Sequence, residues 1–327
     1  MPRTEELRVA TTTGGLAGTL TLPDDPPTGE RGRSPAALLL PSWLPRTRDG
    51  DWDRAAHRPW FADGPDQMPG LLGRLAEALA RHGVASLRCD PRGCGASDGA
   101  WESTSLFTRI DDARDQLAAM RSDRRLDLRR TGILGHGEGA TLALSVAIGD
   151  PAVSALTLIG SAARSWRDVA RRGVATRARS GEDRRHPIVA ALDRSSEDVL
   201  ERAERREGVM RLHLKGGSSV ELELAGIEQA IHTPPLALAT MLHRSVALVH
   251  GERDAWSHPD ESALLAAALV EAANAPAIRL VPGAGHDLAE APDGLMDEVA
   301  RDLAARIQPV ELPPVLVAIE EMDGDLR

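Results

Sequence analysis

The feature that most constrains this chain is a glycine-rich turn between a predicted strand and a predicted helix. Residues 131–134 have the character of a buried strand, and a helix is expected over residues 141–147. Between them, glycine occupies positions 135, 137 and 139. Because glycine lacks a Cβ atom, these positions allow a sharp reversal and a close approach to neighbouring backbone. The chain is therefore expected to pass directly from strand to helix here.

Similar strand and helix patterns alternate along most of the chain. Such alternation is typical of βαβ units, and it predicts an α/β fold with a mainly parallel sheet and helices on both faces. An N-terminal hairpin is expected over residues 6–22, with Gly14-Gly15 as its turn. The remaining predicted strands are 36–40, 84–87, 131–134, 153–159, 245–250 and 277–281, and the predicted helices are 71–82, 108–121, 141–147, 262–273 and 295–307.

The alternation stops in one long segment that is rich in arginine and glutamate. This segment has helical periodicity at 195–206 and a hairpin pattern at 209–224. We interpret it as an inserted cap, although core helices with an unrecognised pattern are an alternative. The predicted organisation is an α/β core of residues 1–163 and 245–308, a cap of residues 164–244 and a Pro-punctuated C-terminal arm of residues 309–327.

Composition narrows the classes of function. The chain has 327 residues and a net charge of -10, which argues against nucleic-acid binding. It contains no apolar run long enough for a membrane span and no recognisable signal peptide. Its two cysteines, Cys89 and Cys94, are expected to be free thiols of a cytoplasmic protein. We expect a small-molecule substrate, no metal and no cofactor, and the sequence leaves homo-oligomerisation open.

The glycine-rich turn also matches a catalytic motif at every position except the central one. The nucleophile elbow G-x-S-x-G corresponds to Gly135-His136-Gly137-Glu138-Gly139. Together with four other segments in the same order, this turn resembles the α/β-hydrolase superfamily, and within it bacterial esterases and serine-aminopeptidase-like hydrolases. The four segments are Leu38–Trp43 with Arg48-Asp49-Gly50, Leu87–Ser97, Val249–Asp254 and Gly283–Asp287.

The resemblance implies a fold and roles for individual residues. It implies the α/β-hydrolase fold, with Asp254 as the acid of a catalytic triad and His286 as its general base. Gly137 stands at the nucleophile position, where the family has serine. Glycine has no side chain, so residue 137 cannot form an acyl-enzyme.

The oxyanion hole implied by the resemblance uses backbone N–H groups. These are the N–H of Glu138, which follows the elbow residue, and that of Ser42 or Trp43. Here too the chain departs from its relatives, which favour His-Gly or Gly-Ser-Gly where this chain has Pro41-Ser42-Trp43. Trp43 and His136 are the candidate substrate contacts.

The sequence also offers two residues that could replace the missing serine and one alternative function for the turn, dinucleotide binding. Cys94 is a weak candidate because no activating base is indicated for it, and Thr141 is expected to point away from the site. A dinucleotide fingerprint also fits the glycines, but strand 153–159 does not end in the acidic residue that the ribose requires.

Three functional hypotheses remain. In the first, the His286–Asp254 dyad is the general base of an atypical hydrolysis, elimination, cyclisation or isomerisation of a small organic substrate, such as a specialised metabolite. In the second, the chain is an ester or acyl hydrolase whose serine was replaced by engineering or drift. In the third, it is a ligand-binding pseudo-hydrolase without activity.

Overall fold

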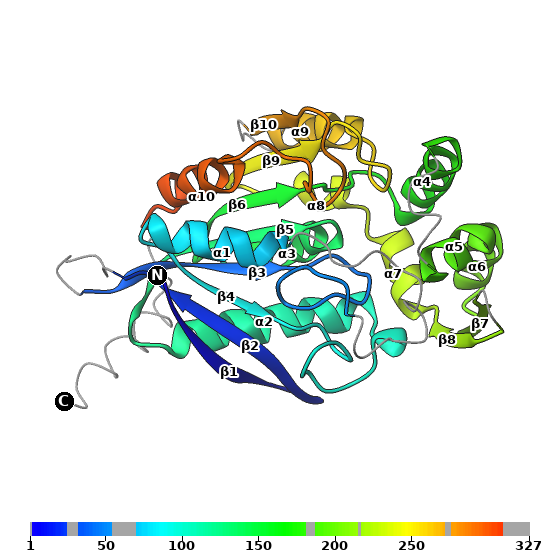
Figure 1. The fold of residues 1–327 in the computed structure, drawn as a ribbon, viewed down its shortest axis with the longest axis horizontal. Helices are drawn as coiled ribbons and strands as arrows, with labels where there is room; N and C mark the ends of the chain where they lie inside the picture. The colour runs from blue at the N-terminus through cyan, green and yellow to red at the C-terminus, as the bar shows by residue number, and fades with distance from the viewer. Residues whose placement is uncertain are drawn as a thin grey trace.

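The computed structural model describes residues 2–24, 32–53, 70–180, 187–214, 217–271 and 276–309. Its centre is an eight-stranded sheet in the order β1-β2-β4-β3-β5-β6-β9-β10 (Figure 1). Strand β2 runs antiparallel to β1 and β4, and the remaining neighbours are parallel, which confirms the predicted sheet. The strands are β1 (Arg3–Thr11), β2 (Gly14–Leu22), β3 (Ser34–Leu40), β4 (Ala85–Cys89), β5 (Leu126–His136), β6 (Val153–Ile159), β9 (Ser245–Gly251) and β10 (Ala277–Val281).

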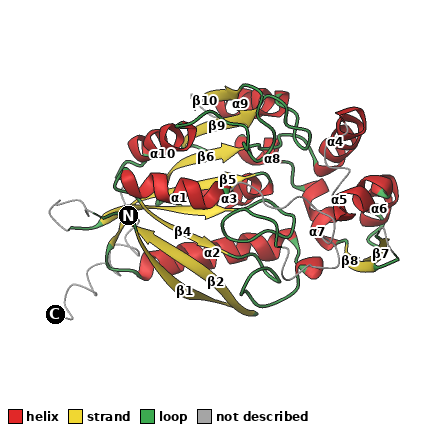
Figure 2. Cartoon of the chain, in the orientation of Figure 1, coloured by secondary structure: helices red, strands yellow, loops and turns green. Residues whose placement is uncertain are grey.

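Helices cover both faces of this sheet, as Figure 2 shows in red. One apolar cluster joins the sheet to α2 (Leu106–Ser122), α3 (Glu138–Gly149) and α9 (Asp260–Glu271). A second cluster joins the opposite face to α1 (Leu71–Arg81) and α10 (Leu295–Arg306). Within the described residues, no helix is both long enough and apolar enough to span a membrane.

The turn of the N-terminal hairpin lies earlier than predicted. Thr11 pairs with Gly14, and Ala10 pairs with Gly15, so the turn is Thr12-Thr13 and both glycines belong to β2. Gly14, the first residue of β2, has φ 138°, a backbone conformation that L side chains rarely adopt, so the strand itself favours glycine at this position.

The segment between β6 and β9 forms a group of helices and a small hairpin beyond the carboxyl ends of the parallel strands (Figure 1). The predicted helix and hairpin are present within it. Its apolar residues share a third cluster with Leu44 and Trp101, while α8 packs on α3 and α9 of the core. The elements are α4 (Trp166–Ser180), α5 (Pro187–Arg194), α6 (Ser196–Glu204), β7 (Val209–His213), β8 (Ser219–Glu223), α7 (Ala225–His232) and α8 (Pro235–Ala239), and a short 3-10 helix, η1 (Trp101–Ser103), contacts β8. The predicted arm falls outside the described residues from residue 310 onward.

Candidate functional site

The turn between β5 and α3 has the strained geometry of a nucleophile elbow. Gly137 has φ 56° and ψ −119°, a conformation that L side chains rarely adopt. A Cβ atom on Gly135 would lie 2.2 Å from the Gly139 carbonyl oxygen. A Cβ atom on Gly139 would lie equally close, 2.2 Å, to the Leu40 carbonyl oxygen. The close approach that the sequence predicted for the outer glycines is therefore present.

The structure brings His286 and Asp254 together in front of this turn. His286 Nδ1 lies 2.7 Å from Asp254 Oδ2. The other carboxylate oxygen, Oδ1, accepts the backbone N–H groups of Trp256 and Ser257 at 2.8 and 2.9 Å. The far side of the imidazole faces the elbow, because a Cβ atom on Gly137 would lie 3.0 Å from His286 Nε2. The acid and the histidine thus have the arrangement of a catalytic dyad.

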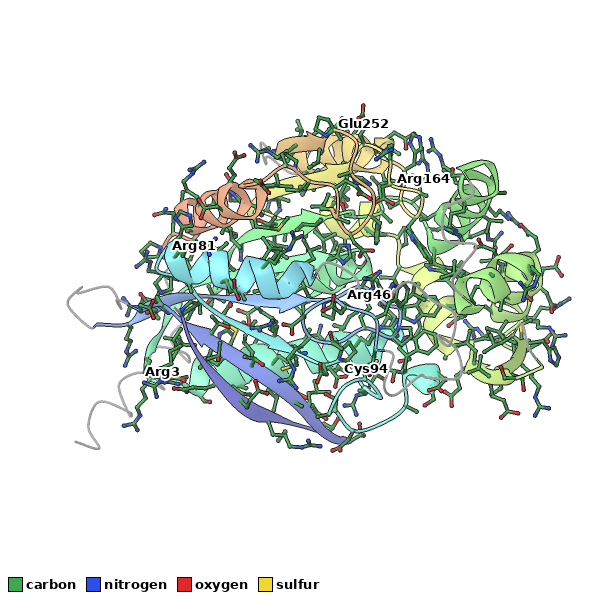
Figure 3. All side chains as sticks on the ribbon, in the orientation of Figure 1. Arg3, Arg46, Arg81, Cys94, Arg164 and Glu252 are labelled. Carbon is green, nitrogen blue, oxygen red and sulfur yellow. The ribbon has the colours of Figure 1, made fainter. Side chains whose placement is uncertain are left out.

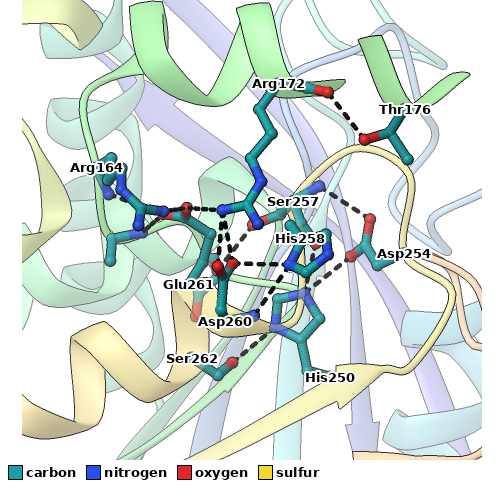
Figure 4. Close-up of polar contacts among 12 residues, drawn as sticks. Arg164, Arg172, Thr176, His250, Asp254, Ser257, His258, Asp260, Glu261 and Ser262 are labelled. Carbon is teal, nitrogen blue, oxygen red and sulfur yellow. Dashed lines mark hydrogen bonds and ion pairs between the residues drawn. The ribbon is translucent and has the colours of Figure 1, made fainter. Parts of the chain in front are cut away.

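His250 supports the acid, although its sequence position indicated only packing. Its Nε2 lies 3.2 Å from Asp254 Oδ2 and 2.7 Å from the Ser257 carbonyl oxygen. Its Nδ1 lies 2.6 Å from the Ser262 hydroxyl (Figure 4). With Nδ1 accepting that hydroxyl proton, Nε2 is the protonated nitrogen; it donates to the Ser257 carbonyl oxygen and has Asp254 Oδ2 as a second, more distant acceptor. A histidine at the end of β9, four residues before the acid, was the only sequence sign of this contact.

For both residues of the dyad, burial and the neighbouring charges shift the pKa in opposite directions. Burial lowers the pKa of His286, but the Asp254 carboxylate and its hydrogen bond outweigh burial, and the net pKa is raised. For Asp254, burial raises the pKa, but His286 and His250 outweigh it and hold the pKa well below its ordinary value. The carboxylate therefore stays ionised and stabilises a protonated imidazole, as an acid that orients a general base must do.

His136 lies behind the dyad and not in the pocket, so its predicted substrate contact is wrong. Its side chain is fully buried, and its Nε2 lies 3.1 Å from the His286 carbonyl oxygen. Burial lowers the pKa of His136 to about 3, so this ring stays neutral. The neighbouring Asp287 forms a buried ion pair with Arg46, at 2.8 Å between Oδ1 and Nη1. These residues fix the backbone that carries His286.

Glu138 begins α3, immediately after the elbow. Its buried carboxylate pairs with Arg109, with 2.9 Å between Oε2 and Nε, and burial outweighs this partner and raises its pKa. The first N–H groups of a helix have no partner within the helix, and the helix dipole adds positive potential there. The backbone N–H of Glu138 therefore has the local setting predicted for an oxyanion donor.

A cavity lies in front of the elbow, between the core and the inserted segment. Including its open mouth it measures about 1060 Å³, and its walls are mainly apolar. Trp43 lines it and packs against Trp101 and Trp166, with ring centroids 5.4 and 5.8 Å away. Arg46 and Arg164 lie on the side of the core that faces the insertion (Figure 3). The predicted site residues that line the cavity are Ser42, Trp43, Gly137, Glu138 and His286, and Asp254 lies buried behind His286.

Of the other hydroxyl and thiol groups near the site, only Thr141 is placed differently from its prediction. Cys94 has no exposed surface, and burial raises the pKa of its thiol. Ser97 donates its hydroxyl to the Asp90 carbonyl oxygen at 2.7 Å. Thr141 lines the cavity and does not point away from it, because the first turn of α3 faces the pocket. Within the described part of the chain, no group of three His, Cys, Asp or Glu side chains is arranged to hold a metal ion.

Comparisons with known proteins agree with the fold. The fold is similar to that of Est1E from Butyrivibrio proteoclasticus, solved with ferulic acid (15% identity, TM-score 0.60, 91% of this chain and 96% of that one). It is also similar to an esterase domain from Rhodothermus marinus (16% identity, TM-score 0.57, 93% of this chain and 97% of that one). A third similar structure is the acylaminoacyl peptidase of Pyrococcus horikoshii (13% identity, TM-score 0.60, 98% of this chain and 44% of that one). No curated protein sequence gave a match. The family model of serine aminopeptidase, S33, matches residues 63–293, which is more than half of the chain, and the chain therefore belongs to this family of α/β-hydrolases.

Proposed function

We propose that this protein is an enzyme in which the His286–Asp254 dyad acts as a general base on a small organic substrate, without a covalent intermediate on residue 137. One observation carries the proposal. The dyad is intact, with 2.7 Å between Nδ1 and Oδ2, and the opposite nitrogen faces the place where Gly137 has no side chain. A base in this position accepts a proton from a hydroxyl group held beside Nε2.

The polarity of the cavity supports a substrate with an apolar part. Trp43, Trp166 and Trp256 line the walls, and the cationic side chains nearby have partners. Arg177 pairs with Asp193, with 2.5 Å between Nη2 and Oδ1, and Arg164 pairs with Glu261. We therefore expect an uncharged acyl or aromatic group to occupy the cavity. The inserted segment supplies part of these walls, in keeping with a cap.

The elbow supports a substrate with a carbonyl group. Proton removal by His286 makes the ring positive, and Asp254 offsets that charge. Attack on a carbonyl carbon makes its oxygen negative, and the N-terminus of α3 at Glu138 suits such an oxygen. The hydroxyl that attacks comes from water, from the substrate or from another side chain, because Gly137 has none.

Hydrolysis of p-nitrophenyl acetate and butyrate tests the proposal. We expect His286→Ala to lower kcat/KM by about 10²–10⁴-fold, which is the usual contribution of a general base. His258→Ala is the matched control, because that ring lies on an exposed loop and contacts only Asp260 among the described residues. An unchanged rate in folded His286→Ala would refute the proposal.

The two other hypotheses predict different results in the same assay. A ligand-binding pseudo-hydrolase binds the esters without turnover and is indifferent to Asp254→Asn. A hydrolase that has merely lost its serine shows turnover only after Gly137→Ser. Turnover by the unaltered chain that depends on Asp254 would contradict both.

A further inference from the structure

The space above Gly137 is not empty in the structure. A Cβ atom on Gly137 would lie 2.5 Å from the hydroxyl oxygen of Ser42 and 3.0 Å from the Ser42 Cβ. The same point lies 3.0 Å from His286 Nε2. The Ser42 side chain, which comes from the loop after β3, therefore occupies the region that a side chain at residue 137 would fill.

The hydroxyl group that residue 137 lacks is present at residue 42. Residue 137 is glycine where the family motif has serine. Residue 42 is the serine of Pro41-Ser42-Trp43, which stands where relatives favour His-Gly or Gly-Ser-Gly. Its hydroxyl oxygen lies 2.5 Å from the point where residue 137 would carry a Cβ atom.

The Ser42 hydroxyl is also free to react. Ser42 is half-buried and lines the cavity, and its hydroxyl has no hydrogen bond to any of the described residues. His286 Nε2 likewise has no partner within the described residues. Catalytic hydrogen bonds are often long or poorly aligned without substrate and tighten only in its complex. His286 Nε2 and the Ser42 hydroxyl therefore both lie beside the Gly137 Cβ position, and neither has a partner among the described residues.

We propose that Ser42 is the nucleophile of this enzyme and that its hydroxyl is the group that His286 deprotonates. The inference rests on the proposed role of the dyad and names the group on which the base acts. It also names the substrate class, which is a carboxylic ester or a related acyl compound with an apolar acyl group.

The reaction balances with water as the only co-reactant. His286 Nε2 takes the proton of the Ser42 hydroxyl as Oγ bonds to the carbonyl carbon, and the carbonyl π electrons move to its oxygen. The C–O bond to the leaving group then breaks, and the leaving group takes the proton from Nε2. Water next gives a proton to His286 and attacks the acyl-Ser42 carbonyl, and the regained proton returns to Ser42 Oγ when the acid product departs.

Other hydroxyl groups in the cavity are less well placed. Ser257 donates its hydroxyl to the Ser161 carbonyl oxygen at 3.0 Å. Thr141 lies a full turn into α3 and is not among the atoms nearest to the Gly137 Cβ position. Thr141→Ala therefore serves as a matched control, because it removes a hydroxyl from the same cavity.

Labelling with a fluorophosphonate, followed by peptide mass mapping, tests the proposal. We expect an adduct on Ser42 in the unaltered protein and in Thr141→Ala. The adduct should be absent from Ser42→Ala and slowed about 10²–10⁴-fold in His286→Ala. Turnover of p-nitrophenyl butyrate should fall about 10³-fold or more in Ser42→Ala and little in Ser122→Ala, which removes an exposed hydroxyl at the end of α2 outside the cavity.

The two proposals fail in different ways. If Ser42→Ala keeps turnover that His286→Ala loses, the base stands and Ser42 is not the nucleophile. If the unaltered protein takes no adduct on Ser42, the inference is likewise overturned. If His286→Ala leaves turnover unchanged, both proposals are wrong.

The double exchange Ser42→Gly/Gly137→Ser gives an independent readout. It removes the side chain that would crowd residue 137, so the adduct should move from residue 42 to residue 137. Gly137→Ser alone should label more slowly than the double exchange, because its Cβ atom would meet Ser42 at 2.5 Å. Equal labelling of the single and the double variant would contradict the proposed sharing of this space.

Discussion

The two sides of the cavity differ in how firmly their functional groups are held. On the side of β9 and β10, both oxygens of Asp254 have partners, and His286 is fixed through Nδ1. On the side of β3 and β5, Gly137 has no side chain, and the Ser42 hydroxyl has no hydrogen bond to a described residue.

This difference separates two requirements of a general-base enzyme. The base must have a fixed tautomer and orientation, which hydrogen bonds provide before substrate arrives. A hydroxyl that is to be deprotonated must remain available, and a strong partner would compete with the base. The side with Asp254 and His286 therefore suits a general base, and the side with Ser42 suits a hydroxyl group that is to lose its proton. Five variants test this contrast.

The largest expected effect comes from Asp254→Asn. Asparagine keeps an oxygen for the N–H groups of Trp256 and Ser257, but its amide would donate toward His286 Nδ1 and favour the wrong tautomer. We expect kcat/KM for p-nitrophenyl esters to fall about 10³–10⁴-fold with little change in folding. Asp302→Asn, which changes an exposed carboxylate on α10, is the control, and a loss below tenfold in Asp254→Asn would contradict the fixed-base interpretation.

The second effect concerns stability. Arg46→Leu leaves Asp287 buried without its ion-pair partner, and breaking a buried pair in this way costs about 3–5 kcal/mol. Urea unfolding should show this loss. Arg202→Leu, which removes an exposed pair with Asp198, should cost under about 1 kcal/mol. Equal losses in the two variants would show that the rigid side does not depend on this ion pair.

The third effect is a dependence of stability on pH that arises from His136. Its pKa is about 3 in the fold against 6.5 for an ordinary histidine, so the unfolded chain binds the extra proton between these values. Stability must therefore fall as the pH drops below about 6.5, by up to about 1.4 kcal/mol per pH unit from this group. Unfolding of His136→Gln at pH 6.5 and 5.0 should show a correspondingly smaller slope.

His286 acts in the other direction and in another pH window. Its raised pKa contributes stability that is complete below about pH 6.5 and is lost as the pH rises through the folded-state pKa. His286→Ala should therefore leave the slope below pH 6.5 unchanged. If His136→Gln and His286→Ala alter the slope of stability in the same pH range, the opposite pKa shifts of the two rings are wrong.

The smallest effect concerns the wall of the cavity. Trp166→Ala removes an edge-to-face partner of Trp43, and such pairs contribute about 0.5–1.5 kcal/mol. We expect the KM for the butyrate ester to rise about 2–10-fold, while kcat changes little. Leu236→Ala, at an exposed position on α8, should leave the KM unchanged. A fall in kcat without a change in KM would show that Trp166 positions the catalytic groups and does not bind the acyl chain.

Much of the fold follows from the sequence pattern. Strand β6 was predicted at its observed bounds, because a short apolar run between turn residues permits little else. The hairpin turn lies before Gly14 and not at Gly14-Gly15, because both turn and strand can contain glycine and only the strand pairing distinguishes them. The support of the dyad by His250 was missed, because a hydrogen bond between side chains has no periodic signature.

The sequence by itself indicated the α/β-hydrolase fold, Asp254 and His286 as a candidate dyad, and the missing side chain at Gly137. These depend on local backbone requirements and on motifs in a fixed order. Only the tertiary structure decided that His136 lies behind the base and that Ser42 fills the space above Gly137. The physical reason is that β3 and β5 are neighbours in the sheet but far apart in the chain, so the contact between their ends exists only after folding.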